Sequence, residues 1–173
     1  MKHTPSQQLI KSVKAILIII TMTLGITPLI AQEHDMKPSD KKPDHIMVKP
    51  DNVKWADAPN SIPAGAKASV IEGDPKVAGL FTMRLSLPAN YKIPAHWHPA
   101  DEHVTVLSGA LYMGIGDKFD ESKLQSLPAG SFAVMVMGTR HYASTKEATI
   151  IQLHGMGPWG IHYVNPADDP RNK

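Results

Sequence analysis

Short runs of apolar and β-branched residues, separated by Gly, Pro, Asn, Asp or Ser, recur along the chain from residue 67 to residue 164. The runs that have the length of β-strands are Lys67–Glu72, Gly79–Leu87, Tyr91–His98, Glu102–Leu107, Ala110–Ile115, Ser131–Met137, His141–Thr145, Ala148–His154 and Ile161–Val164. Short strands with closely spaced turn signals are typical of a β-sandwich or a β-barrel. One helix fits the pattern, at Asp120–Leu127, because Asp120 can cap its first turn and Pro128 ends it. The pattern therefore predicts an all-β fold with at most one short helix.

The first 31 residues have the three-part layout of a secretory signal peptide. Residues 1–14 carry positive charges and no acidic side chain, Ala15–Leu24 is mostly apolar, and the segment ends at the small residue Ala31. We expect cleavage after Ala31 and a periplasmic or secreted protein, although Leu29 is larger than the residue usual two positions before such a cut. An uncleaved anchor is the alternative, but the apolar core is shorter than the roughly 20 residues that cross a bilayer.

The exported part is expected to be one domain that follows a short lead. Residues 32–45 are dominated by Lys, Asp, Pro and His and offer little apolar surface to bury, so they predict a flexible lead. Residues 46–173 have the length of a single domain and contain no internal repeat.

Composition and charge exclude several classes of function. The chain has no cysteine, which excludes disulfides, thiolate metal sites and cysteine nucleophiles, so any metal must be held by His and carboxylates. Three of the 18 Lys and Arg residues lie in the signal segment, and the remaining ones nearly balance the 16 Asp and Glu. We therefore expect no nucleic-acid binding, and no membrane contact after signal cleavage.

The segment from His96 to Glu102 contains the residues best suited to bind a metal ion. His96 and His98 are two positions apart, so on a strand they share a face and lie about 6.5 to 7 Å apart along it, within reach of one ion. Pro99 helps to turn the chain, and Glu102 then lies in phase with Val104 on the face predicted to point inward. A carboxylate buried there, with no Lys or Arg at the inward positions, is costly unless a cation neutralises it.

A third histidine strengthens the prediction of a metal site. His141 follows a glycine turn that begins at Gly138, and this turn can deliver the first residue of the next strand to the same end of a barrel. The imidazoles of His96, His98 and His141 and the carboxylate of Glu102 make a site for one divalent first-row metal. An octahedral ion held this way keeps up to two positions free for a ligand.

These residues resemble the two sequence motifs of the cupin superfamily. The matching patterns are His96-x-His98-x3-Glu102-x6-Gly109 and Gly130-x5-Val136-x-Gly138-x2-His141. The chain departs from the family pattern at Asn90, where a glycine is usual, at Val136, where a proline is usual, and at Thr145, where an asparagine is frequent. None of the three is a ligand in the pattern, so the departures affect turns and strand ends more than the metal site.

The resemblance implies a double-stranded β-helix, also called a jelly-roll or cupin barrel, over roughly residues 66–164. It implies that His96, His98, Glu102 and His141 bind one divalent transition metal ion, which could be Fe, Mn, Zn, Ni or Cu. Within the superfamily, the chain is similar to small exported single-domain bacterial cupins and to the cupin module of some anti-sigma factors. The motifs are specific for the fold and say almost nothing about a reaction.

Several residues outside the motifs are further candidates. Gln152 and His154 share one face of their strand, and if that face lines the barrel they could orient a substrate or a metal-bound water, with His154 also handling a proton. A structural, hydrogen-bonded histidine is the alternative for His154. His103 has the opposite strand parity from Glu102, so we expect it to point outward or into a subunit interface. Trp159 is expected to pack over a mouth of the barrel.

Three functions fit these residues. The first is a metal-dependent enzyme for a small oxygen-bearing substrate, with dioxygenase-like oxidation or Lewis-acid chemistry depending on the metal. The second is a noncatalytic module that binds or senses a metal or a small ligand, and the third is a structural barrel. Leu107 and Ile151 are apolar at positions expected to point outward, so a homodimer is also possible.

Overall fold

The computed structural model describes residues 44–173 of the chain. The signal peptide predicted for residues 1–31, and all of the predicted lead except its last two residues, lie outside this described part. Among residues 44–173, no helix is long and apolar enough to cross a membrane. The domain boundaries proposed from the sequence stay predictions.

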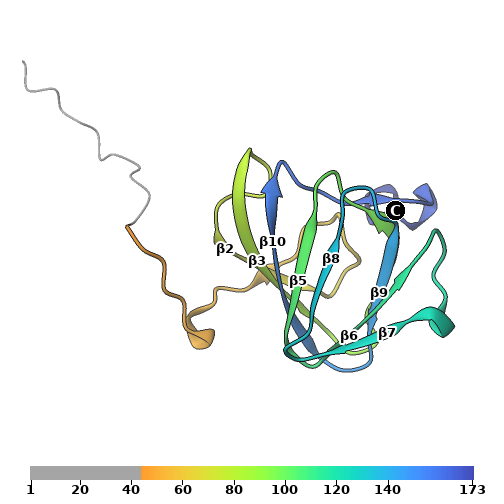
Figure 1. The fold of residues 1–173 in the computed structure, drawn as a ribbon, viewed down its shortest axis with the longest axis horizontal. Coiled ribbons are helices and arrows are strands. Elements are labelled where there is room, and N and C mark those ends of the chain that lie inside the picture. Colours follow the sequence, from red (N-terminus) through yellow and green to blue (C-terminus); the bar gives the residue numbers. More distant parts are fainter. Residues whose placement is uncertain (1–43) are drawn as a thin grey trace, which may run out of the picture. The chain divides into compact units, whose positions relative to one another are not determined.

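Eleven β-strands run through the described residues. They are β1 Ala56–Asp57, β2 Lys67–Glu72, β3 Gly79–Leu87, β4 Lys92–Trp97, β5 Glu102–Ser108, β6 Ala110–Ile115, β7 Gln125–Pro128, β8 Phe132–Met135, β9 His141–Thr145, β10 Thr149–Gly157 and β11 His162–Tyr163. They form two antiparallel sheets, one in the order β1-β2-β3-β10-β5-β8 and the other in the order β11-β4-β9-β6-β7. Strands far apart in the sequence, such as β3 and β10, lie side by side (Figure 1). The predicted all-β jelly-roll barrel is confirmed.

The helical content differs in detail from the sequence-based prediction. The described residues contain four short 3-10 helices and no α-helix: Pro50–Asn52, Glu121–Lys123, Pro166–Asp168 and Pro170–Asn172. Asp120 caps the second of these, because its Oδ1 accepts a hydrogen bond from the N–H of Ser122 at 3.0 Å. The predicted helix is wrong beyond that turn, since Gln125–Pro128 forms β7 and pairs with β6. Ladder hydrogen bonds satisfy the backbone there in place of helical ones.

The burial pattern of β3 shows how the core is formed. Phe81, Met83, Leu85 and Leu87 are buried, and the residues between them are more exposed, because successive side chains of a strand point to opposite faces. The same alternation along β10 buries Ile151 and Leu153 against β3 and β5. Tyr91, Ile93, Val104, Val106, Leu111 and Met113 belong to the same core.

Two of the departures from the cupin pattern have a structural explanation. Asn90 has a φ of 59°, in the left-handed region that glycine enters freely and asparagine enters more readily than most side chains. Thr145 is buried, and its hydroxyl donates to the carbonyl of Pro88 at 2.6 Å and accepts from the N–H of Tyr91 at 3.1 Å. This hydroxyl closes the turn that carries Asn90 and leads into β4.

Candidate metal centre

Two buried histidines lie at the end of β4. His96 is in the strand, and His98 lies two residues after His96. Their side chains therefore lie on the same side of the backbone, as the alternation of side chains along a strand predicts. They are 4% and 3% exposed. The ring of Trp97 lies instead against His162, with 4.4 Å between the ring centroids.

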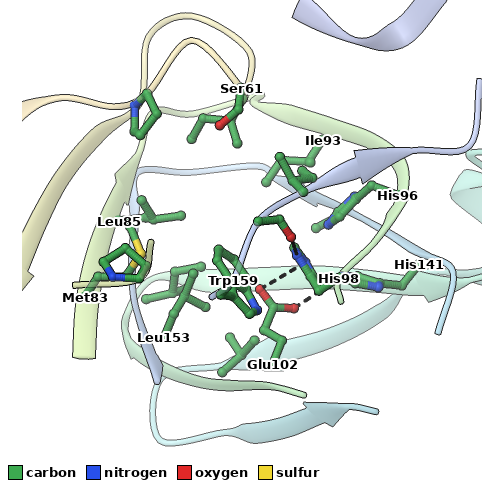
Figure 2. Close-up of a pocket in the computed structure, with 18 of the residues that line it drawn as sticks. Ser61, Met83, Leu85, Ile93, His96, His98, Glu102, His141, Leu153 and Trp159 are labelled. Carbon is green, nitrogen blue, oxygen red and sulfur yellow. Dashed lines mark hydrogen bonds and ion pairs between the residues drawn. The ribbon is translucent and has the colours of Figure 1, made fainter. Parts of the chain in front are cut away.

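Glu102 and His141 are the first residues of β5 and β9, and both are buried as well. Glu102 Oε1 lies 3.5 Å from His98 Nε2, and Oε2 lies 3.2 Å from His141 Nε2. His141 pairs with His96 in the register of β9 and β4, and their ring centroids are 4.2 Å apart. Figure 2 shows the four side chains converging beside one cavity. The structure thus brings together all four residues that the sequence proposed as ligands, while ligation itself stays a prediction.

Backbone carbonyls orient all three imidazoles. The accepting oxygens are those of Pro94 for His96 Nδ1 at 2.7 Å, Gly160 for His98 Nδ1 at 2.7 Å and Thr139 for His141 Nδ1 at 2.9 Å. A carbonyl oxygen can only accept, so each Nδ1 carries a proton, and Nε2 is the nitrogen of each ring that is left to bind a metal. Such outer hydrogen bonds are typical of histidines that bind metals.

The positions of the ligand atoms fit a metal ion. One nitrogen from each of His96, His98 and His141 lies within 4.8 Å of the other two. Two nitrogens bound to one ion at about 2.0–2.1 Å are at most about 4.2 Å apart, so small side-chain movements complete the site. His98 Nε2 is buried without a hydrogen-bond partner, which costs free energy unless another group or an ion approaches it. The three histidines could therefore hold a divalent transition metal, and the donor set does not choose among the candidate metals.

The charge state of the site also suits a metal. Burial, with smaller contributions from His141 and His98, lowers the pKa of His96 to about 3. Burial also lowers the pKa of His98. Burial by itself would raise the pKa of Glu102, but the hydrogen bond with His141 and the charges of the neighbouring histidines outweigh it and lower that pKa to about 2. At neutral pH the site therefore combines the neutral imidazoles of His96 and His98 with the Glu102 carboxylate, the forms of these groups that bind metal.

Trp159 and Gly160 hold His98 from a distant part of the chain. The Trp159 indole stacks on the His98 ring, with 4.2 Å between centroids and 14° between planes, while the Gly160 carbonyl accepts from Nδ1. The N–H of Trp159 donates to the carbonyl of Pro75 at 2.7 Å. No local sequence pattern indicates these contacts, because His98 and Gly160 are 62 residues apart.

The metal centre borders a cavity of about 180 Å³. Its remaining wall is mostly apolar and comes from both sheets, with Met83, Leu85 and Leu153 across from the histidines (Figure 2). The loop between β1 and β2 also lines it through Ser61, whose carbonyl accepts from the Tyr163 hydroxyl at 3.0 Å. The contribution of this loop has no signal in the sequence.

The structure corrects the expectation for Gln152 and His154. Ile151 and Leu153 of β10 are buried and line the cavity, so Gln152 and His154 lie on the other face of the strand, away from the metal centre. Arg84 Nε donates to Gln152 Oε1 at 3.0 Å on that face. The side chains of Gln152 and His154 therefore cannot contact a substrate or a metal-bound water in the cavity. The burial of Ile151 also contradicts its expected outward position.

Two other residues lie where they were expected. His103 is on the outer face of β5 and stacks on His154, with ring centroids 5.0 Å apart. Leu107 is 41% exposed and points outward. Trp159 lines the cavity, and it therefore does more than pack over the barrel mouth.

Comparison with known sequences identifies one protein family. The model of one protein family, described as a domain of unknown function (DUF4437), matches residues 30–169. No curated protein has a matching sequence.

Three solved structures share the fold at low sequence identity. The polyketide cyclase RemF from Streptomyces resistomycificus is 15% identical, with a TM-score of 0.60 over 72% of this chain and 88% of that protein. A candidate acetylacetone dioxygenase from Methylibium petroleiphilum is 20% identical, with a TM-score of 0.56 over 75% and 87%. An RmlC-like cupin from Shewanella frigidimarina is 13% identical, with a TM-score of 0.51 over 66% and 91%. These similarities confirm the cupin fold.

Proposed function

This chain belongs to the DUF4437 family, a domain of unknown function, and we propose that it is an exported, metal-dependent cupin enzyme. One divalent transition metal is bound by His96, His98, Glu102 and His141, and the enzyme acts on a small oxygen-bearing substrate. The observation that carries this proposal is the convergence of three imidazole nitrogens and one carboxylate beside a mostly apolar cavity.

Each residue of the centre has a separate task. The carbonyls of Pro94, Gly160 and Thr139 keep the proton on Nδ1 and aim Nε2 at the common point. Glu102 supplies the negative charge that offsets a divalent ion, and the apolar wall keeps bulk water away from it. A bound metal would polarise a substrate oxygen or, if redox-active, support oxidation by O₂.

The cavity limits where a proton can come from. Besides the four proposed ligands, Lys76 is the one titratable residue among the described residues that line it. Lys76 is exposed and lies in the loop between β2 and β3. Proton transfer close to the metal centre therefore depends on Glu102 or on water.

The similar solved structures give limited support to an enzymatic role. One is named as a polyketide cyclase and another as a candidate acetylacetone dioxygenase, and what they share with this chain is the fold.

Metal analysis of protein purified without a histidine tag tests the metal site. We expect close to one equivalent of a transition metal, either as purified or after reconstitution. Less than about a tenth of an equivalent, with no uptake on reconstitution, would contradict the proposal, because a preformed three-histidine site binds such metals readily.

A noncatalytic binding module is the second candidate function. It is favoured by the position of Gln152 and His154 on the outer face, which leaves the cavity without a dedicated acid or base. Oxygen consumption by the iron-loaded protein with catechols, thiols and keto acids distinguishes the two, since we expect turnover from an enzyme and none from a binder. The zinc-loaded protein is tested for isomerisation or lyase activity with the same catechols, thiols and keto acids, because zinc would support Lewis-acid chemistry and not oxidation.

Export and dimerisation are also proposals. The lysines of residues 1–14 and the apolar Ala15–Leu24 support export, and the mass of the protein recovered from the periplasm should correspond to a chain that starts at Gln32. Exposed apolar side chains on the outer face, such as Leu107 and Val134, support a homodimer. Light scattering that gives the monomer mass at micromolar concentration would contradict it.

A further inference from the structure

The wall of the cavity away from the metal centre offers a ligand almost no polar partner. Its side chains come from both sheets and are apolar: Met83, Leu85, Leu111, Met113, Ile151 and Leu153 are examples. Apart from the four proposed metal ligands, the side chains with a polar atom among the described lining residues are those of Ser61, Lys76 and Trp159. The Trp159 Nε1–H is buried without a hydrogen-bond partner, and its ring stacks on His98, so it belongs to the metal end. Ser61 and Lys76 belong to loops outside the sheets. A ligand can thus form polar interactions at the metal end and at these loops, but not along the sheets.

The volume of the cavity indicates the size of the ligand, or of the part of a ligand, that it can surround. A cavity of about 150 Å³ with aliphatic and aromatic walls holds one benzene molecule and stays free of water otherwise. The cavity here has about 180 Å³, which corresponds to a ligand of about six to eight non-hydrogen atoms. A nucleotide or a disaccharide would extend beyond this space into the solvent.

We propose that the ligand of this site is a compact, mostly apolar molecule with a single oxygen-bearing end, such as a phenol or a cyclic ketone. Its oxygen lies toward His98 and Glu102, and its carbon body packs against Met83, Leu85 and Leu153. The placement of the oxygen rests on the proposed metal function, whereas the selection for an apolar body rests on the cavity alone. Polyols and sugars are disfavoured, because each hydroxyl buried without a partner weakens binding about tenfold.

A second charge on the ligand is disfavoured for the same reason. Besides the proposed metal ligands, Lys76 is the one charged side chain among the described lining residues, and it is exposed in a loop and is not part of either sheet. A charge buried against Met83 and Leu85 would lose its hydration without compensation. The cavity therefore selects against molecules that carry a second charged group on the part that packs against the sheets.

Calorimetric titration with three probes of similar size tests the proposal. Para-cresol has one hydroxyl and an apolar body, erythritol is a polyol of matching size, and para-hydroxybenzylamine adds an ammonium group at the far end. We expect the zinc-loaded protein to bind para-cresol at least tenfold more tightly than either of the others. Equal or tighter binding of erythritol or of the amine would overturn the proposal, and so would a failure of para-cresol to bind zinc-loaded protein.

The metal-free protein separates this proposal from the proposed function. If para-cresol binds with the same preference over erythritol while no transition metal is taken up, the cavity assignment holds and the metal function fails. If metal binds and para-cresol does not, the metal function stands and the ligand assignment fails.

An isosteric pair of variants locates the ligand in the cavity. Met83→Gln places an amide in the wall with nearly the same shape, and we expect it to weaken para-cresol binding about tenfold. Met137→Gln changes a residue that is 63% exposed outside the cavity, and should leave the affinity unchanged. Unchanged affinity in a folded Met83→Gln protein would contradict the placement. If circular dichroism shows that Met83→Gln does not fold, the proposal is tested by the titration of the unmodified protein with para-cresol, erythritol and para-hydroxybenzylamine.

Discussion

Replacement of His98 by alanine is expected to abolish metal binding at stoichiometric concentrations. The change removes a buried nitrogen whose lone pair points to the other two histidines and to Glu102. Loss of an outer partner of a metal ligand already weakens binding about 10- to 100-fold, so loss of a ligand should weaken it by about 100-fold or more. Competition with a chromophoric chelator measures the affinity of the folded variant.

His103→Ala is the matched control for this experiment. His103 is only five residues away, but it lies on the outer face of β5 and stacks on His154. We expect this variant to retain the metal affinity of the unmodified protein. Equal retention by both variants would contradict the proposed site, and equal loss would mean that the effect of His98→Ala is not specific to the proposed ligands.

The second large effect expected is acid lability of the metal-free protein. The pKa of His96 is about 3 in the folded state, below the value of 6.5 for a free side chain. Between these two pH values the unfolded chain binds a proton that the folded chain does not, so stability falls as the pH decreases from 6.5 to about 3. Each unit of pKa difference is worth about 1.4 kcal/mol, so the total loss reaches several kcal/mol.

Glu102 adds to this acid lability with the same sign. Its pKa is about 2 in the folded state and 4.5 in a free side chain, so its contribution is complete above pH 4.5 and is lost as the pH falls toward 2. Urea denaturation at a series of pH values, with a chelator present, measures both contributions. His96→Asn should flatten the curve between pH 6.5 and 3, whereas His45→Asn, at an exposed position, should not. A curve for His96→Asn as steep as that of the unmodified protein would refute the assignment.

The expectation that Gln152 and His154 line the barrel is wrong, because the alternation of side chains along a strand does not by itself identify the inner face. Alternation correctly places these two residues opposite Ile151 and Leu153, but it does not state which face points into the barrel. The cavity wall is mostly apolar apart from the metal centre, and Ile151 and Leu153 line it, so the apolar face of β10 is the buried one. On the outer face, Gln152 finds its partner in Arg84, which lies on the neighbouring strand β3.

The predicted short helix is wrong for a related reason. Asp120 and Pro128 are correct signals for a helical start and a stop, and the cap is present. The stretch between them becomes an edge strand because β6 offers unpaired backbone groups that a short helix would leave unused. Such pairing depends on where β6 lies, which a local pattern does not contain.

By itself, the sequence determined all the strands except β1 and β7, the shared face of His96 and His98, and the placement of Glu102 and His141 at the starts of their strands. These features follow from side-chain alternation and turn residues, which act over a few positions. Only the tertiary structure decided the inner face of β10, the carbonyl of Gly160 on His98, the stacking of Trp159 and the apolar wall of the cavity. Those contacts join residues that are far apart in the chain, and the packing of two sheets brings them together.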